Sequence, residues 1–165
     1  MKIIFLDIDG VLNYQKLFIK TKNQRLNYSK YLAYPDYLKS LFIKLLEIDI
    51  NKLYLLKEII KETNSKVVIT SSWRYLNIYP LVEEYLTNLG IPIIDATPYI
   101  ESKRGEEIKT YLKNKQIDNY VIIDDDIFSD FDQELLDHLI HTNFYTDGLD
   151  EDNVKDAIYK LKKQL

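Results

Sequence analysis

The sequence predicts an α/β fold with a parallel sheet, because short apolar runs alternate with longer amphipathic segments. The apolar runs are rich in β-branched and aromatic residues, as strands buried on both faces of a parallel sheet are. They cover residues 3–6, 67–69, 91–94, 120–123 and, with a weaker pattern, 139–142. At 165 residues, the chain is expected to form a single domain over residues 1–165.

Helical periodicity explains most of the segments between these runs. Apolar residues at helical spacing occur within residues 53–60, 81–89 and 108–112. A last helix is predicted for residues 151–163, with its apolar residues on one side and Asp150 as its N-cap. This alternation of strand and helix is typical of βαβ units.

Residues 13–49 interrupt the alternation and are predicted to form a small basic, aromatic cap inserted after the first strand. Residues 13–44 carry seven Lys and Arg against one Asp, a net charge of +6; the whole chain carries −4, so the remainder carries −10. The segment is expected to be irregular at first and helical from about Asp36 to Glu47. Two interpretations are open: a solvated lysine surface over a small satellite core, or a lid that recruits an anionic, ring-bearing ligand.

The composition excludes several kinds of catalytic site. Because the chain has no Cys, disulfide scaffolds, thiolate zinc sites and cysteine nucleophiles are excluded. Its four Gly residues form neither a Walker A loop nor a G-x-G-x-x-G fingerprint, and its two His residues are too few for a three-histidine metal site. The 26 Asp and Glu residues are therefore the groups expected to carry any chemistry.

The sequence gives no sign of a membrane-spanning or secretory segment. No apolar stretch approaches the roughly 20 residues that cross a bilayer. The N-terminal apolar run ends after four residues, at Asp7, which argues against a signal peptide. We therefore expect no membrane partner and a cytoplasmic location, whereas the oligomeric state is not specified.

Polar side chains follow the predicted strands at their carboxyl ends, where open parallel sheets bind ligands. These clusters are Asp7-Ile8-Asp9-Gly10 after the first strand, Thr70-Ser71-Ser72 after the second, Asp95-Ala96-Thr97 after the third, Ser102-Lys103-Arg104-Gly105 at the next helix start, and Asp124-Asp125-Asp126 after the fourth. We expect the clusters to converge at one edge of the sheet.

The residue types in these clusters indicate phosphoryl chemistry. Asp7 and Asp9 would repel the acids after the fourth strand unless a divalent cation neutralised them. A site of carboxylate oxygens suits Mg²⁺, which keeps several waters and takes other ligands from substrate phosphate. Hydroxyls after the second strand can donate hydrogen bonds to a phosphoryl group, and Arg104 can neutralise its charge. An aspartate can also act as the nucleophile.

Four of these clusters, all except Asp95-Ala96-Thr97, resemble in order along nearly the whole chain the four motifs of the haloacid dehalogenase (HAD) superfamily. Residues 3–12, Ile-Ile-Phe-Leu-Asp-Ile-Asp-Gly-Val-Leu, resemble the first motif. The resemblance implies Asp7 as the nucleophile and Asp9 as the general acid and base. It also implies a metal ion held by Asp7 and by the main-chain carbonyl of Asp9.

The other motifs extend the resemblance. Residues 66–71 resemble the second motif, which implies Ser71 as the phosphate-binding hydroxyl, with Ser72 one residue away. Arg104 takes the basic position of the third motif, where the family more often has Lys, and the adjacent Lys103 is the alternative. Residues 120–125 resemble the fourth motif, which implies Asp125 as a metal ligand supported by Asp124.

The resemblance implies a three-layer Rossmann-like fold with five parallel strands in the order 5-4-1-2-3. It also implies Mg²⁺-dependent hydrolysis of a phosphomonoester through an aspartyl-phosphate. Residues 69–74, 104–108 and 148–149 are similar to HAD-like domains associated with RNA repair proteins, which favours a nucleotide or a nucleic-acid terminal phosphate as substrate. Two alternatives are open: a phosphotransferase of the same fold, and a non-catalytic phosphate-binding regulatory module.

Three further features have structural interpretations from the sequence. Ser72 is a candidate helix N-cap. Trp73, the only tryptophan, is expected to pack in the core or in a loop. His138 and His141 are expected near the fifth strand and are assigned no function.

Overall fold

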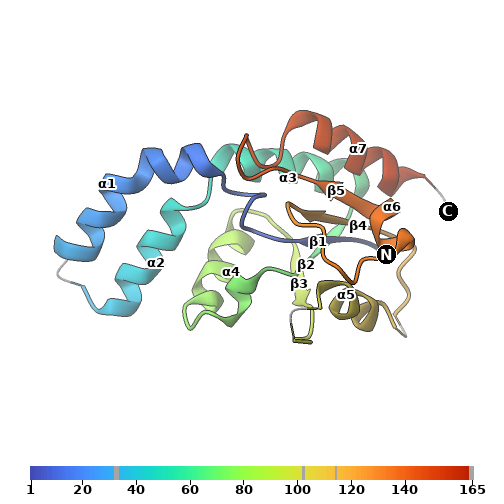
Figure 1. Cartoon of the computed structure of the whole chain (residues 1–165), viewed down its shortest axis with the longest axis horizontal. Coiled ribbons are helices and arrows are strands. Elements are labelled where there is room, and N and C mark those ends of the chain that lie inside the picture. The colour runs from blue at the N-terminus through green and yellow to red at the C-terminus, as the bar shows by residue number, and fades with distance from the viewer. Residues whose placement is uncertain (32–33, 102, 114, 164–165) are drawn as a thin grey trace.

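The computed structural model describes residues 1–31, 34–101, 103–113 and 115–163, and it has three layers (Figure 1). Its five parallel strands form one sheet in the order β3-β2-β1-β4-β5. The strands are β1 (Lys2–Leu6), β2 (Lys66–Ile69), β3 (Ile93–Ala96), β4 (Asn119–Asp124) and β5 (Leu139–His141). The expected α/β fold and strand order are therefore confirmed, the order being the same one read from the opposite edge.

Helices cover both faces of the sheet. They are α1 (Gln15–Tyr31), α2 (Asp36–Leu46), α3 (Ile50–Thr63), a 3₁₀ helix at Ser72–Tyr75, α4 (Tyr79–Asn88), α5 (Arg104–Leu112), α6 (Gln133–His138) and α7 (Glu151–Lys162). Helices α3, α4 and α7 contribute buried side chains to one face of the sheet, and α5 and α6 to the other. In Figure 1, α3 and α7 lie above the sheet and α5 lies below it.

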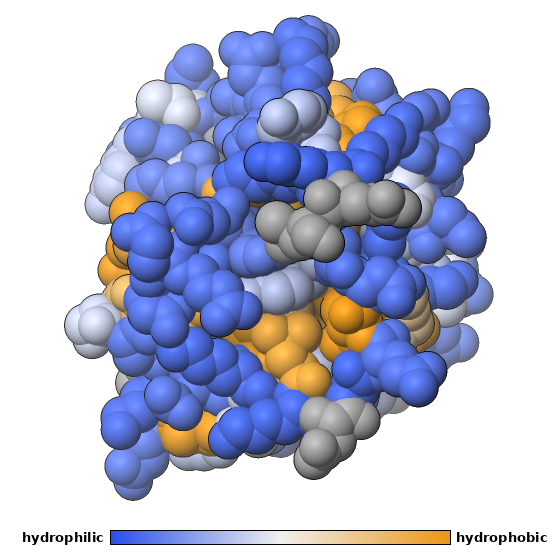
Figure 2. All heavy atoms as spheres, turned by 90° about the vertical axis from the view of Figure 1, so that its right-hand side faces the viewer, coloured by the Kyte–Doolittle hydropathy of each residue, from blue (hydrophilic) through white to orange (hydrophobic). Residues whose placement is uncertain are grey.

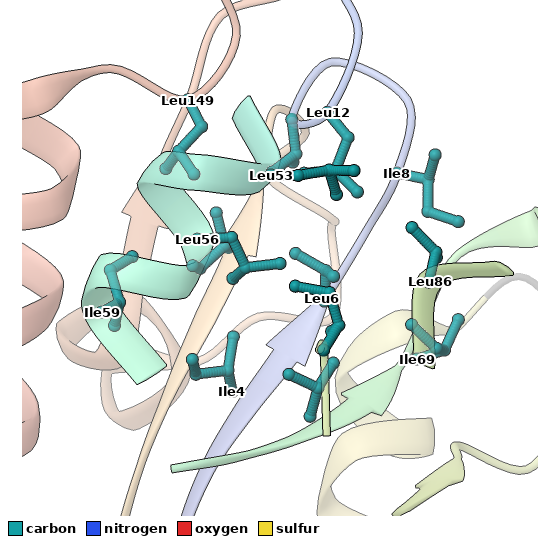
Figure 3. Close-up of a cluster of buried hydrophobic side chains, with 14 of the residues drawn as sticks. Ile4, Leu6, Ile8, Leu12, Leu53, Leu56, Ile59, Ile69, Leu86 and Leu149 are labelled. Carbon is teal, nitrogen blue, oxygen red and sulfur yellow. The ribbon is translucent and has the colours of Figure 1, made fainter. Parts of the chain in front are cut away.

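The alternation of side chains along β1 explains why both faces are covered. Successive side chains of a strand point to opposite faces, and every residue from Ile3 to Leu6 is fully buried. Ile4 and Leu6 point toward α3, where they meet Leu56 (Figure 3). Phe5 points to the other face and makes edge-to-face contact with Tyr111 of α5, at 5.6 Å between ring centroids. A continuous apolar strand is thus the signature of a central position in this sheet.

The register of β1 brings three loops to the same edge of the sheet. Leu6 is aligned with Ile69 of β2 and with Ile123 of β4. The backbone bonds continue one residue further, since Asp7 N donates to the carbonyl of Ile123 at 3.0 Å. Thr70 N likewise donates to the carbonyl of Leu6 at 2.9 Å. The polar residues after these strands therefore begin side by side.

Helices α1 and α2 pack side by side and project from this edge (Figure 1). We call residues 15–46 the hairpin, of which residues 32–33 lie outside the described part. The expectation that its first part is irregular is wrong, because Gln15–Tyr31 form α1. Polar residues surround most of α1, so its sequence lacks the apolar stripe that predicts a helix. Its helical form instead depends on tertiary packing against α2.

Other differences from the sequence prediction are local. β3 begins at Ile93 rather than at residue 91, because Pro92 has no N–H with which to extend the ladder. The six-residue α6 was not predicted, since so short a helix shows little periodicity. Asp150 is confirmed as the N-cap of α7, where its carboxylate accepts from Asn153 N at 2.8 Å. Ser102 lies outside the described residues.

The surface at the amino ends of the strands is mostly hydrophilic (Figure 2). This is the side of the molecule at which the N-terminus lies, at the right of Figure 1. Within the described ranges, no helix is long and apolar enough to cross a membrane. The clustered acids and hydroxyls lie at the opposite edge, where the strands end.

Candidate active site

The loop after β1 places two carboxylates at the strand edge. Asp7 is 8% exposed, and Asp9 is half-buried. Gly10 follows with φ +68°, in the left-handed region that favours glycine. The turn is closed by Leu12 N, which donates to the carbonyl of Ile8 at 2.9 Å. This turn directs the chain away from the sheet and toward the hairpin.

The carboxylate of Asp9 is held by two side-chain donors. Trp73 Nε1 donates to Asp9 Oδ2 at 2.9 Å, and Asn13 Nδ2 donates to Asp9 Oδ1 at 2.8 Å. Asn13 Oδ1 also accepts from Gly10 N at 2.9 Å, so the side chain that holds Asp9 is itself bonded to the turn. Each oxygen of Asp9 therefore has a fixed partner. This orients the carboxylate, as a general acid requires.

The sequence indicated neither of these donors. Trp73 is buried in the core as expected, at 2% exposed, but its indole N–H also reaches the site. Asp9 and Trp73 are 64 residues apart, so no local pattern predicts their contact. Asn13 is only four residues after Asp9, and the one signal that could have indicated it is a polar residue at the end of the apolar Gly-Val-Leu turn.

Asp7, Asp124 and Asp125 form a compact acidic cluster. One carboxylate oxygen from each lies within 4.8 Å of the others. Burial raises the pKa of Asp7, and the Arg104 charge and the Ser71 hydroxyl act against this rise. Burial, reinforced by the charge of Asp7, raises the pKa of Asp124 to about 8. Burial and the charge of Asp126 raise the pKa of Asp125 to about 6.

The cluster fits a divalent cation. Asp7 Oδ1 and Asp124 Oδ2 are buried and have no hydrogen-bond partner among the described residues. Buried carboxylate oxygens without partners are costly, and so are like charges held together. A Mg²⁺ ion would offset both costs, because it prefers oxygen ligands and needs few from the protein.

Arg104 lies beside this cluster. Arg104 is the first residue of α5 and is 9% exposed. Its Nη1 lies 3.8 Å from Asp124 Oδ2. At that separation Nη1 makes no hydrogen bond in the described structure, although it is buried. Its guanidinium carbon lies 5.0 Å from the ring centroid of Phe128. The adjacent Lys103 is exposed, so the structure brings Arg104, and not Lys103, to the site.

The loop after β2 places two hydroxyls at different depths. Ser71 is fully buried beside Asp7, whereas Ser72 is exposed. The prediction of Ser72 as an N-cap is wrong, because Ser71 caps the 3₁₀ helix by accepting from Trp73 N at 3.3 Å. The cap fits the extended backbone of Ser71, at φ −63° and ψ 147°. Ser72 is left free to face the solvent-accessible side of the site.

A buried ion pair connects this loop to α5. Arg74 Nη2 lies 2.7 Å from Glu107 Oε2, and both side chains are about 5% exposed. Arg74 Nη1 also donates to the carbonyls of Thr70 and Ser71, the latter at 2.7 Å. Because α5 also begins with Arg104, this pair fixes the hydroxyl loop relative to that guanidinium. The two partners are 33 residues apart, and the sequence did not predict the contact.

A cavity of about 570 Å³ opens above these groups. Its lining includes the predicted site residues Asp7, Asp9, Ser72, Arg104 and Asp125. Ser71 and Asp124 lie directly behind them, both fully buried. The structure thus brings together residues from the ends of β1, β2 and β4 and from the start of α5. Its size suits a small organic ligand rather than a single ion.

The remaining walls of the cavity come from outside the predicted motifs. Phe18 of α1, Lys44 of α2 and Glu47 contribute from the hairpin side. Phe128, between β4 and α6, and Phe144, between β5 and α7, contribute from the body of the domain. The sequence indicated only that the hairpin is basic and aromatic, and it gave no signal for the last two rings.

One predicted cluster and a second cavity lie apart from this site. The cluster predicted after the third strand is not brought to the site: Asp95 and Ala96 lie within β3 rather than after it, and Asp95 pairs with Lys115 Nζ at 3.3 Å. A second cavity of about 590 Å³ lies where α3 and α7 begin, and it is lined by Tyr54 together with four acidic side chains and no cation. Such a lining is unsuited to a phosphate group.

A family model matches residues 3–154 of the chain, and its description is "HAD domain in Swiss Army Knife RNA repair proteins". The chain belongs to this family. HAD domains are generally phosphatases, and they are typically Mg²⁺-dependent. Comparisons with curated proteins and with solved structures found no significant match. The matched range includes all five strands apart from Lys2, and it contains the acidic cluster, the hydroxyl loop and the start of α5.

Proposed function

We propose that the protein is a Mg²⁺-dependent phosphomonoester hydrolase that acts through an aspartyl-phosphate on a nucleotide or a nucleic-acid terminal phosphate. The observation that carries this proposal is a single cavity in which a buried carboxylate, a clamped second carboxylate and a partly unpaired guanidinium face one another. These are Asp7, Asp9 and Arg104. The three groups supply a nucleophile, an acid and a phosphate-binding cation.

The proposed reaction has two steps. A carboxylate oxygen of Asp7 attacks phosphorus in line, and the bond from phosphorus to the ester oxygen breaks as Asp9 protonates that oxygen. Asp9, now a carboxylate, takes a proton from water as the water oxygen attacks the phosphorus of the aspartyl-phosphate. The bond to Asp7 then breaks, which restores its carboxylate and releases inorganic phosphate.

The other residues of the site hold the phosphoryl group. Hydroxyls of Ser71 and Ser72 donate to its oxygens, and Arg104 offsets its negative charge. Asp7, Asp124, Asp125 and the main-chain carbonyl of Asp9 would hold the Mg²⁺ ion. When bound, Mg²⁺ supplies positive charge that reduces repulsion between the Asp7 carboxylate and the phosphate dianion.

The family description and the charge of the hairpin support a nucleotide or nucleic-acid substrate. A panel of mononucleotides and of 3′- or 5′-phosphorylated oligonucleotides, assayed at two salt concentrations, tests this. A polymer end bound through several lysines should lose turnover steeply with salt, whereas a mononucleotide should lose much less. Release of inorganic phosphate from none of them would contradict the proposal. Recovery of the phosphate on an added acceptor would instead indicate a phosphotransferase.

Mg²⁺ is expected to raise the thermal stability of the protein. The ion removes repulsion within a cluster that the folded state must otherwise hold, so it binds the folded state selectively. Saturation by about 100-fold over the dissociation constant corresponds to about 2.7 kcal/mol, or a rise in Tm of about 5 to 10 °C. Asp125→Asn should remove most of this rise, and Asp152→Asn, at an exposed acid of α7, should keep it. An equal rise in all three proteins would contradict the assigned site.

Trp73→Phe is expected to affect protonation of the leaving group selectively. The variant keeps an aromatic ring in the core but loses the hydrogen bond to Asp9 Oδ2. Alkyl phosphates, whose leaving oxygens need a proton, should lose about 10- to 100-fold in kcat, and p-nitrophenyl phosphate only a few-fold. The matched control is Tyr79→Phe, at another buried ring whose hydroxyl has no partner in the described structure. Equal losses on both substrates would show that Trp73 has only a packing role.

A further inference from the structure

We propose that Phe18 and Phe144 form a binding subsite for a planar ring of the substrate, so that the protein selects phosphomonoesters that carry a nucleobase. This inference rests on the proposed function, and it assigns the site a specificity determinant. The ring would occupy the part of the cavity farther from the acidic cluster, between the hairpin and the body of the domain.

The two rings meet across the boundary between hairpin and body. Phe18 is on α1 and Phe144 follows β5, yet their ring centroids are 5.7 Å apart at an interplanar angle of 62°. Both side chains are half-buried, and both line the cavity that contains Asp7. Aromatic surface that is left partly exposed inside a polar cavity is what a stacking ligand requires.

Phe18 is fixed in position by Arg25. The guanidinium carbon of Arg25 lies 4.7 Å from the Phe18 ring centroid, and its Nη2 donates to the Phe18 carbonyl at 2.8 Å. Nη1 of the same guanidinium donates to Glu47 Oε1 at 3.1 Å, which anchors it at the end of α2. The ring is therefore held before any ligand binds, and a pre-organised site avoids the cost of ordering it.

Phe144 is fixed by the backbone. Its carbonyl accepts from Gln15 N at 2.9 Å, so the loop after β5 is joined to the first residue of α1. Tyr145, which is 73% exposed, adds an edge-to-face contact to the Phe144 ring at 5.5 Å between centroids. The hairpin and the body thus meet at the aromatic pair, and a ligand ring placed there would contact both.

The polar residues of the cavity indicate which end of a substrate would reach the aromatic pair. Arg104 and the acidic cluster hold the phosphoryl end of a substrate, so the aromatic pair is available to its other end. Lys44 also faces this cavity, with Nζ at 4.3 Å from the Trp73 ring centroid and 2.7 Å from Glu47 Oε2. A ligand with an anionic group and a flat ring, joined by a sugar, matches this distribution of charge and aromatic surface.

The test compares substrates that differ only in the base. The pairs are a nucleoside 5′-monophosphate with ribose 5-phosphate, and a terminally phosphorylated oligonucleotide with the same chain carrying an abasic terminal residue. Wild type should favour the base-bearing member in kcat/KM. Phe144→Leu and Phe18→Leu should lower that preference about tenfold, through KM, because stacking contributes about this much per base. The base-free members should change by less than about twofold.

Two controls separate the possible results. Phe42→Leu, at a ring of α2 that contacts Tyr28 and Tyr34 instead, should leave the preference unchanged. Equal losses on both members of a pair would overturn the subsite, and so would a wild type without preference. If no phosphomonoester is turned over, the proposed function fails instead. The subsite is then judged by equilibrium dialysis of adenosine, which should bind wild type and be lost in Phe144→Leu; a wild type that binds no adenosine would overturn it.

Discussion

Asp7→Asn is expected to reduce phosphatase turnover by at least about a thousandfold and to leave the fold intact. An amide is a far weaker nucleophile than a carboxylate, so the aspartyl-phosphate would not form. Because Asp7 is 8% exposed and lies against Asp124, its charge is costly in the folded protein. Removing that charge should leave Tm unchanged or raise it when Mg²⁺ is absent. Phosphate release and thermal unfolding of the same preparations measure both effects.

A matched variant shows whether the effect belongs to the site. Asp95→Asn removes the carboxylate of an exposed aspartate near the carboxyl end of β3, which pairs with Lys115 outside the cavity. Its turnover should stay within about twofold of wild type. If Asp7→Asn retains wild-type turnover, the covalent mechanism is wrong, and a folded but inactive Asp95→Asn would show that the assay reports general damage to this edge of the sheet.

The fold and the positions of the catalytic candidates could be predicted because both depend on local patterns. A strand buried on two faces must be apolar throughout, so the run at residues 3–6 predicted a buried strand, and the family resemblance placed it at the centre of the sheet. Parallel strands end at one edge, so the acids that follow the central strands β1 and β4 were expected to meet there, although Asp95 of β3 does not join them. The contact among Asp7, Asp124 and Asp125 agrees with this expectation, because β1 and β4 are neighbours in register.

The supporting contacts could not be predicted, because they depend on how distant segments pack. Trp73 reaches Asp9, and Arg74 reaches Glu107, only after β2 has been placed beside β1 and near α5. No periodicity or local spacing records such a contact. These contacts orient the Asp9 carboxylate and the hydroxyl loop after β2. The contacts that set the geometry of the site are therefore the ones that could not be predicted from the sequence.

In the hairpin, too, the composition could be taken from the sequence but the directions of the side chains could not. Its composition predicted a basic, aromatic segment, but whether this segment covers a satellite core or faces a ligand depends on side-chain direction. Side chains of α1 differ in this respect: Thr21 is buried, at 6% exposed, whereas Phe18 lines the cavity. Lys16 and Lys20 remain exposed on α1. Only the direction of each side chain distinguishes the residues available to a substrate.

Gly10→Ala is expected to abolish both turnover and stabilisation by Mg²⁺. A Cβ at Gly10 would lie 2.0 Å from Asp125 Cγ, so the carboxylate of Asp125 must move. That movement would disrupt the acidic cluster, in which Asp125 contributes one of the three oxygens. The positive φ of +68° adds a backbone cost of about 1 to 2 kcal/mol for any L residue. The variant should therefore unfold at a lower temperature and show no rise in Tm with Mg²⁺.

Gly90→Ala separates these two effects, because it imposes the backbone cost without the collision. Gly90 has φ +87°, and a Cβ there would approach nothing closer than the flexible Lys57 Nζ, at 3.5 Å. Gly90→Ala should lose a similar 1 to 2 kcal/mol of stability, about 2 to 8 °C in Tm, yet keep turnover and the full response to Mg²⁺. If Gly10→Ala keeps that response as well, Asp125 does not hold the ion. The backbone cost of the positive φ at Gly10 would then account by itself for the lower stability of Gly10→Ala.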